Sequence, residues 1–137
     1  MGKIFYLICL IPCILLNGCA NNTGRDSISE KGEKAMYAQI TAEEAKTIMD
    51  TEEDYIILDV REQDEYDEGH VPGAILIPYT EINAKAFEKL TDKDALILVY
   101  CRSGRRSKIA AQSLVDLGYT NVKEFGGIID WPYEVEK

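Results

Sequence analysis

The chain has 137 residues, a formal net charge of -9 and four cysteines. This length suits one domain with one modest hydrophobic core, and the sequence contains no internal repeat. The acidic charge disfavours nucleic acids and anionic lipid headgroups as partners, because their phosphates would repel the surface.

The N-terminal residues have the pattern of an export signal. Lys3 precedes an apolar stretch from Ile4 to Leu16, shorter than the roughly 20 residues of a membrane-spanning helix. The stretch closes on Leu16-Asn17-Gly18-Cys19, which resembles a bacterial lipoprotein signal. The resemblance implies that residues 1–18 are removed and that Cys19 is lipidated; an ordinary secretory signal and an uncleaved anchor are the alternatives.

Residues 19–35 are polar and are expected to form a flexible tether. The protein would then be a membrane-anchored lipoprotein of the cell envelope, held by the lipid alone and facing the periplasm or another extracytoplasmic space. Cys9 and Cys13 would leave with the signal, so Cys101 would be the only thiol of the mature chain. A lone thiol in an oxidising compartment indicates a chemical role.

Residues 36–137 are expected to form the one folded domain, in which short apolar runs alternate with helical patterns. We expect strands at residues 37–40, 55–60, 74–77, 95–100 and 122–125, and helices at residues 42–50, 62–68, 81–90 and 108–117. Thr41 and Glu44 form a capping box for the first helix. Ser107 is expected to cap the last helix and Ile109 to lie on its apolar face. The alternation predicts an α/β fold, a small parallel sheet flanked by helices on both faces.

The strand at residues 95–100 delivers one cysteine into a loop rich in arginine, Cys101-Arg102-Ser103-Gly104-Arg105-Arg106-Ser107. Ligands of parallel sheets bind at the carboxyl ends of the strands, and Cys101 lies at such an end. The amides of a tight loop, the N-terminus of the next helix and nearby arginines all favour a thiolate. The pattern therefore predicts an ionised, reactive Cys101 beside an anion site, the alternative being a buried structural cysteine.

The segment Cys-Arg-Ser-Gly-Arg-Arg, residues 101–106, resembles the active-site loop of rhodanese sulfurtransferases. Other landmarks of that family follow in the same order and spacing: Asp59-Val60-Arg61-Glu62, Glu65-Tyr66, Gly69-His70-Val71-Pro72-Gly73-Ala74, Ile77-Pro78, Gly126-Gly127 and Trp131. The resemblance spans residues 36–133 and implies the rhodanese-like α/β fold. It also implies a persulfide mechanism, in which Cys101 takes sulfane sulfur from thiosulfate or a similar donor and passes it to a thiophilic acceptor, cyanide in vitro.

The resemblance and the charge pattern together suggest roles within the loop. Arg102 and either Arg105 or Arg106 are expected to hold the oxygens of the donor anion, and Gly104 permits the tight turn. The amides from Ser103 to Arg106 would cradle the persulfide. No cofactor is expected, and the protein is expected to act as a monomer.

Other landmark residues are expected to be structural. Asp59 and Arg61 would form an ion pair beneath the loop, as the family resemblance suggests. His70, the only histidine, would make a structural hydrogen bond and offers no cluster for a metal. Trp131 would cover the core, and the acidic run at residues 62–68 is expected to be a solvated face.

A phosphatase and a sulfur carrier are the alternatives to an enzyme that turns over small sulfur donors. A phosphatase loop of the form Cys-x5-Arg would need arginine at position 107, which is Ser107. The remaining alternative to a sulfurtransferase is a membrane-tethered carrier or binding protein that holds sulfane sulfur with little turnover. Both the enzyme and the carrier use a Cys101 persulfide.

Overall fold

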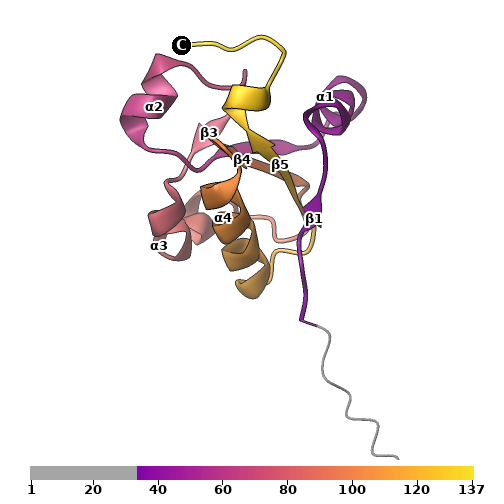
Figure 1. Cartoon of the computed structure of the whole chain (residues 1–137). Coiled ribbons are helices and arrows are strands. Elements are labelled where there is room, and N and C mark those ends of the chain that lie inside the picture. Colours follow the sequence, from indigo (N-terminus) through magenta and orange to yellow (C-terminus); the bar gives the residue numbers. More distant parts are fainter. Residues whose placement is uncertain (1–33) are drawn as a thin grey trace, which may run out of the picture. The chain divides into compact units, whose positions relative to one another are not determined.

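The computed structural model describes residues 34–137. The predicted signal in residues 1–18, the lipidation site Cys19 and most of the tether lie outside the described residues. The described chain forms a five-stranded sheet of order β1-β5-β4-β2-β3 in which all neighbours are parallel (Figure 1). The strands are β1 (Ala38–Gln39), β2 (Ile56–Asp59), β3 (Ile75–Leu76), β4 (Ile97–Cys101) and β5 (Val122–Gly127). The predicted α/β class is confirmed.

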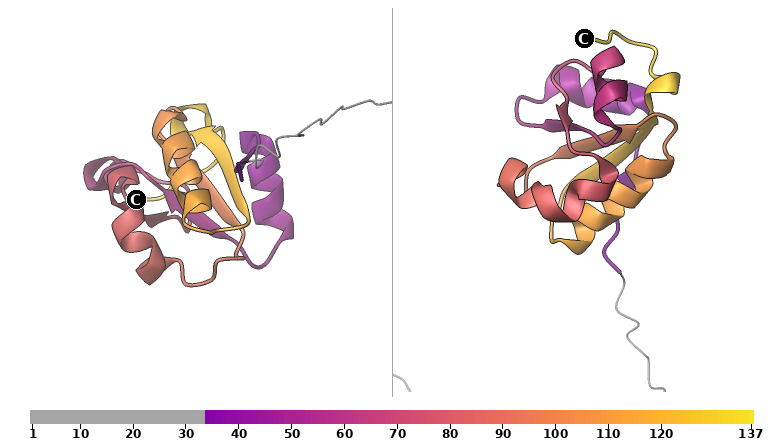
Figure 2. Two further views of the ribbon diagram at one scale, coloured as in Figure 1. Left: turned by 90° about the horizontal axis from the view of Figure 1, so that it is seen from below. Right: turned by 90° about the vertical axis from the view of Figure 1, so that its left-hand side faces the viewer.

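Helices cover both faces of the sheet, as expected. They are α1 (Ala42–Thr51), α2 (Gln63–Glu68), α3 (Ile82–Lys89) and α4 (Arg105–Asp116), with short 3-10 turns at Tyr79–Glu81 and Ile128–Asp130. α1 lies on one side of the sheet, and α3 and α4 lie on the other (Figure 2). The capping box of Thr41 and Glu44 opens α1 as predicted. No helix of residues 34–137 combines the length and the apolar character needed to cross a bilayer.

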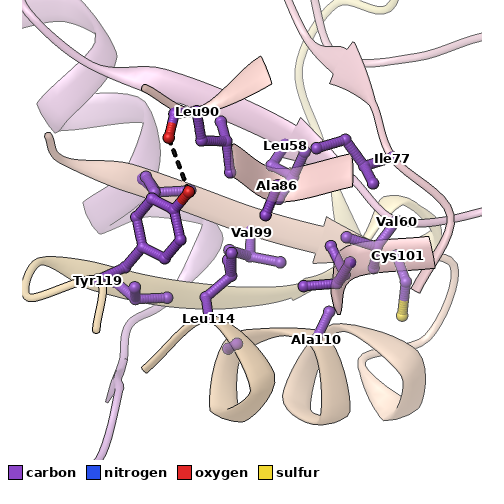
Figure 3. Packing of buried hydrophobic residues seen from close by; sticks show 14 residues of the cluster. Leu58, Val60, Ile77, Ala86, Leu90, Val99, Cys101, Ala110, Leu114 and Tyr119 are labelled. Carbon is purple, nitrogen blue, oxygen red and sulfur yellow. Dashed lines mark hydrogen bonds between the residues drawn. The ribbon is translucent and has the colours of Figure 1, made fainter. Parts of the chain in front are cut away.

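The core consists of one hydrophobic cluster on each face of the sheet. On the side of α3 and α4, Leu58, Val99 and Leu114 pack together, and the Tyr119 hydroxyl donates to the Leu90 carbonyl at 2.7 Å (Figure 3). The cluster on the side of α1 includes Ala45, Ile57, Leu98, Tyr100, Phe125 and Trp131. Because β2 and β4 are covered on both faces, their sequences are continuous apolar runs and not alternating ones.

The start of α4 differs from the prediction. The helix begins at Arg105, and its N-cap is Gly104 at a φ of 95°, whereas Ser107 lies fully buried inside the first turn. The left-handed turn at Gly104 starts the helix earlier than a serine cap would, and it directs the Ser107 side chain inward. Ile109 is 45% exposed and is not part of the buried face of the helix.

Candidate active site

Cys101 is the last residue of β4 and packs on the side of α4 with 1% of its surface exposed. The chain then turns through Arg102 and Ser103 into the N-cap of α4. The Gly104 amide donates a hydrogen bond to Cys101 Sγ at 3.0 Å, and Ser107 Oγ lies 3.4 Å from the same sulfur. The sulfur therefore lies between a donating loop amide and the Ser107 hydroxyl, at the carboxyl end of the sheet.

The loop rests directly on β5 at Gly127. The sheet register pairs Cys101 with Gly127 after an irregularity between Val99 and Cys101. A Cβ on Gly127 would lie 2.0 Å from the carbonyl oxygen of Arg102, a separation that atoms cannot adopt. The same carbonyl accepts a hydrogen bond from the Ile129 amide at 3.2 Å. The family landmark Gly127 therefore allows the loop to approach the strand.

Two opposing effects act on the Cys101 thiol. Burial raises its pKa, because a thiolate is poorly solvated inside the protein. Hydrogen bonds from the Ser107 hydroxyl and from the amides of Ser107, Gly104 and Ser103 favour the thiolate and together outweigh burial. The pKa of Cys101 consequently lies below its ordinary value, which is the direction expected from the sequence.

The three arginines of the loop differ in what they contact. Arg106 makes a forked ion pair with Glu65 of α2, with nitrogen–oxygen distances of 2.6 and 2.8 Å. Arg102 and Arg105 are exposed, and neither belongs to an ion pair within residues 34–137. Of the two arginines considered as the second anion ligand, Arg105 is therefore available, whereas Arg106 is occupied.

The ion pair also corrects the expectation that the whole acidic run at residues 62–68 is a solvated face. The hydrogen bond from Arg106 lowers the pKa of Glu65 to about 2, and the Glu65 side chain is 25% exposed. The two partners are 41 residues apart in the sequence. A local charge pattern contains no information about such a contact, because the fold alone brings α2 to the start of α4.

A second polar network lies at the carboxyl end of β2. Arg61 Nη2 lies 2.6 Å from Asp59 Oδ2 and donates to the Gly69 carbonyl at 2.8 Å. The Tyr100 hydroxyl donates to Asp59 at 2.6 Å and accepts from the Val71 amide at 3.0 Å. The structure thus contains the ion pair expected for Asp59 and Arg61, and it ties β2, β4 and the turn before β3 together.

His70 and Trp131 make the structural contacts expected of them. His70 Nδ1 lies 2.9 Å from the Tyr66 carbonyl oxygen, and the two rings are stacked at a centroid distance of 3.7 Å. Trp131 is buried against Phe125, with ring centroids 5.5 Å apart. The contacts of His70 fix the chain after α2, and those of Trp131 fix the chain after β5.

Glu124 is a residue of the site that the sequence motifs do not identify. It lies on β5 with 3% of its surface exposed, and its Oε1 accepts hydrogen bonds from Ser107 Oγ at 2.6 Å and from the Gly126 amide at 2.8 Å. The available signal was an acid inside a strand that the parallel pattern places in the interior. A carboxylate in that position requires polar partners.

Two cavities lie at different parts of the domain. One of about 560 Å³ opens beside the cysteine loop and is lined by Arg61, Glu65, Glu68, Gly69, Arg102, Ile128, Ile129 and Val135. A larger one, of about 750 Å³, lies between α1 and the C-terminal residues, with Lys46, Trp131 and Tyr133 among its lining residues. Arg102 is the residue of the cysteine loop that lines the smaller of these two cavities, and no residue of the loop lines the larger one.

Comparison with known proteins places this geometry in a family. The family model described as "Rhodanese-like domain" matches residues 41–132. The chain is 37% identical over 99 residues to the putative sulfur carrier protein YrkF of Bacillus subtilis, covering 72% of this chain and 52% of that protein. It is 35% identical over 97 residues to the thiosulfate sulfurtransferase GlpE of Coxiella burnetii, covering 70% of this chain and 88% of that protein.

A solved structure agrees with the sequence matches. The structure titled "rhodanese with anions from E. coli" superposes with a TM-score of 0.57 at 36% identity, covering 61% of this chain and 98% of that one. The chain spans about half the length of the putative sulfur carrier and most of the length of the other two relatives. The chain therefore belongs to the rhodanese-like domain family and is a transferase of the rhodanese type.

Proposed function

We propose that this protein is a sulfurtransferase that moves sulfane sulfur from thiosulfate or a similar anionic donor to a thiophilic acceptor, cyanide in vitro, through a persulfide on Cys101. The observation that supports it best is the hydrogen bonding of the Cys101 sulfur by the loop amides and Ser107, which lowers the pKa of the thiol in a loop that also carries Arg102 and Arg105. The relative named as a thiosulfate sulfurtransferase and the rhodanese solved with anions agree with this proposal.

In the first half of the reaction the Cys101 thiolate attacks the outer sulfur of thiosulfate. A bond forms between the two sulfurs, the bond to the central sulfur of thiosulfate breaks, and sulfite leaves with the electron pair. Arg102 and Arg105 hold the donor's oxygens by charge-assisted hydrogen bonds. Because negative charge on these oxygens grows as sulfite leaves, the arginines stabilise the transition state more than the bound donor.

In the second half cyanide attacks the outer sulfur of the persulfide. Thiocyanate leaves, and the electron pair of the broken bond returns to Cys101 as a thiolate. The amides of Ser103, Gly104 and Ser107, which stabilise the thiolate, stabilise this leaving group as well. The two displacements balance without an external oxidant or reductant, so the donor and the acceptor are the only small-molecule partners that the proposal requires.

The relative named as a putative sulfur carrier favours a second candidate, a tethered carrier that loads sulfur and releases it slowly. Steady-state formation of thiocyanate from thiosulfate and cyanide separates the two. The enzyme predicts many turnovers per protein molecule, whereas the carrier predicts a single burst equal to the protein concentration. Cys101→Ala should abolish the signal in either case, and a variant that retains it would exclude both.

We also propose that the protein is a lipoprotein of the cell envelope. The support is the sequence Leu16-Asn17-Gly18-Cys19 after a short apolar stretch. Fractionation of cells that express the full chain should place the wild type with membranes and Cys19→Ala in the soluble fraction. A wild-type protein found in the soluble fraction would contradict the anchor.

A further inference from the structure

A hydrogen-bonded chain leads from the reactive sulfur to a buried carboxylate. Ser107 Oγ lies 3.4 Å from Cys101 Sγ and 2.6 Å from Glu124 Oε1. Cys101 belongs to β4, Ser107 to α4 and Glu124 to β5, and none of the three is more than 3% exposed. Three elements of the fold therefore bring these polar groups together at one point inside the domain.

Glu124 is a buried carboxylate that has no cation beside it. Its partners are Ser107 Oγ and the Gly126 amide, and no ion pair within residues 34–137 includes it. An ionised carboxylate is costly to bury without a paired charge. A neutral glutamine could accept the same two hydrogen bonds through its amide oxygen. Support of the loop alone therefore does not require an acid at this position.

The Ser107 hydroxyl has one proton to donate. When it donates to ionised Glu124, the nearest of its acceptors, its oxygen lone pairs face Cys101 and favour the protonated thiol. When it donates to the Cys101 thiolate, the short contact to Glu124 is retained only if the carboxyl group carries a proton and donates to Ser107. The carbonyl of Gly104, 3.0 Å from Ser107 Oγ, is a further acceptor but carries no exchangeable proton. The thiol and the carboxyl group thus compete for one proton.

We propose that Glu124 is a positioning residue that stores the proton of the Cys101 thiol, acting through Ser107; this inference rests on the proposed sulfur-transfer function. The S–H bond of Cys101 breaks as its proton moves to Ser107 Oγ, and the hydroxyl proton of Ser107 moves to Glu124. A thiol and a carboxylate become a thiolate and a carboxylic acid, so the net charge of the buried unit does not change. The reverse transfer moves the proton from Glu124 through Ser107 back to Cys101.

Other titratable groups face this unit from neighbouring elements. Arg106 of α4 interacts with Cys101 and is paired with Glu65 of α2, whose pKa is lowered to about 2. Tyr37, beside β1, has a pKa raised by its own burial and by the charge of Glu124. Near neutral pH, Arg106 is therefore protonated, Glu65 is ionised and Tyr37 is neutral. The charges of these three groups therefore stay constant while the thiolate of Cys101 is titrated near neutral pH.

The ultraviolet absorbance of the thiolate, followed against pH in the full chain, tests the proposal. In the wild type, thiolate should appear in two steps, because the second step leaves two negative charges on one unit. Glu124→Gln should show one step, at a pH about one unit below the upper wild-type step, which is about a tenfold larger acid dissociation constant. The matched control Glu53→Gln removes the same charge from an exposed position and should reproduce the wild-type curve.

Ser107→Ala provides an independent variant, because it interrupts the chain and retains Glu124. It should give one step above the midpoint of Glu124→Gln, since the thiolate loses a donor. A single-step wild-type curve, or a Glu124→Gln curve with an unchanged midpoint, would overturn the inference. Thiolate titration does not involve a sulfur donor, so a two-step curve in a protein that never forms a persulfide would reject the proposed function and leave the shared proton standing.

Discussion

Two buried polar networks lie at the carboxyl end of the same sheet, and they differ in charge balance. In the first, Asp59 is paired with Arg61 at 2.6 Å and receives the Tyr100 hydroxyl. In the second, Cys101 is linked through Ser107 to Glu124, and no cation of residues 34–137 forms an ion pair with that carboxylate.

Tyr100 and Cys101 are adjacent on β4 but belong to the clusters on opposite faces of the sheet. The pleat of the strand thus sends one side chain to each network. The first network is charge-balanced, and it connects β2, β4 and the turn before β3. In the second network, the proposed transfer of the thiol proton to Glu124 would favour the thiolate, which is the nucleophilic form of cysteine. The two faces of β4 thus carry different roles: Tyr100 faces the supporting network, and Cys101 faces the reactive one.

Breaking the charge-balanced network of Asp59 and Arg61 should have the largest effect on stability. Asp59→Ala leaves Arg61 buried and unpaired and removes the acceptor of Tyr100, so we expect a loss of about 3–5 kcal/mol in the free energy of unfolding. Urea unfolding measures this loss, with the exposed Asp54→Ala as control. A loss no larger than that of the control would show that the network is not a structural support.

The contact between the loop and β5 should come next. Gly127→Ala places a Cβ where the Arg102 carbonyl now lies, so the loop must move away from the strand. We expect a decrease in kcat/KM for thiosulfate of about 100-fold, because displacements near 1 Å misplace reacting groups. Gly127 has an extended backbone with a φ of -130°, so its substitution adds a clash and no left-handed strain. Gly73→Ala, at a φ of 80° with no atom within 4 Å of the added Cβ, is the control that adds strain without a clash. Equal activity of the two variants would contradict the role of Gly127.

Removal of Arg102 or Arg105, which form no ion pair within residues 34–137, should weaken thiosulfate binding more than removal of the paired Arg106. We expect Arg102→Ala or Arg105→Ala to raise the KM for thiosulfate by about tenfold, as for one charge-assisted hydrogen bond. Thermal unfolding should change little in either variant. Steady-state kinetics with varied thiosulfate measure the effect. A rise in KM confined to Arg106→Ala would reverse the assignment.

The pair of Arg106 with Glu65 should have the smallest effect, and that effect should depend on pH. The folded pKa of Glu65, about 2, is below the ordinary carboxyl value, so the pair stabilises the protein above about pH 4 and loses that contribution as the pH falls toward 2. Arg106→Ala should lower stability at neutral pH by about 1 kcal/mol and flatten this dependence. Unfolding curves at several pH values, with Lys108→Ala as control, measure both. A pH dependence identical to that of the wild type would contradict the pair.

Local patterns in the sequence account for much of the architecture. Continuous apolar runs predicted β2 and β4, because both faces of these strands are buried. The short motif around Cys101 predicted the loop, because the residues that form the loop are neighbours in the sequence. The role of Gly127 is different. Its position was visible as a landmark, but its contact with the Arg102 carbonyl depends on the register between β4 and β5.

Features that depend on distant contacts escaped prediction. Serine is a common N-cap residue, yet α4 begins after the turn at Gly104, so Ser107 lies inside the helix, where it contacts Glu124. Glu124 itself follows Lys123 in a mixed polar and apolar strand. Its place inside a strand of a parallel sheet was a signal of burial, but its contact with Ser107 appears only when α4 packs against β5. Charge and burial at such positions are decided by tertiary packing, which a local pattern does not contain.

The central claim is that Cys101 accepts and releases one sulfur atom. Its most direct test is the intact mass of the purified protein before thiosulfate, after thiosulfate and after added cyanide, with Cys101→Ala measured in parallel. The account predicts that the wild type gains the mass of one sulfur and loses it to cyanide as thiocyanate, while the variant gains nothing. A wild-type protein that gains no sulfur, or a variant that gains it equally, would contradict the account.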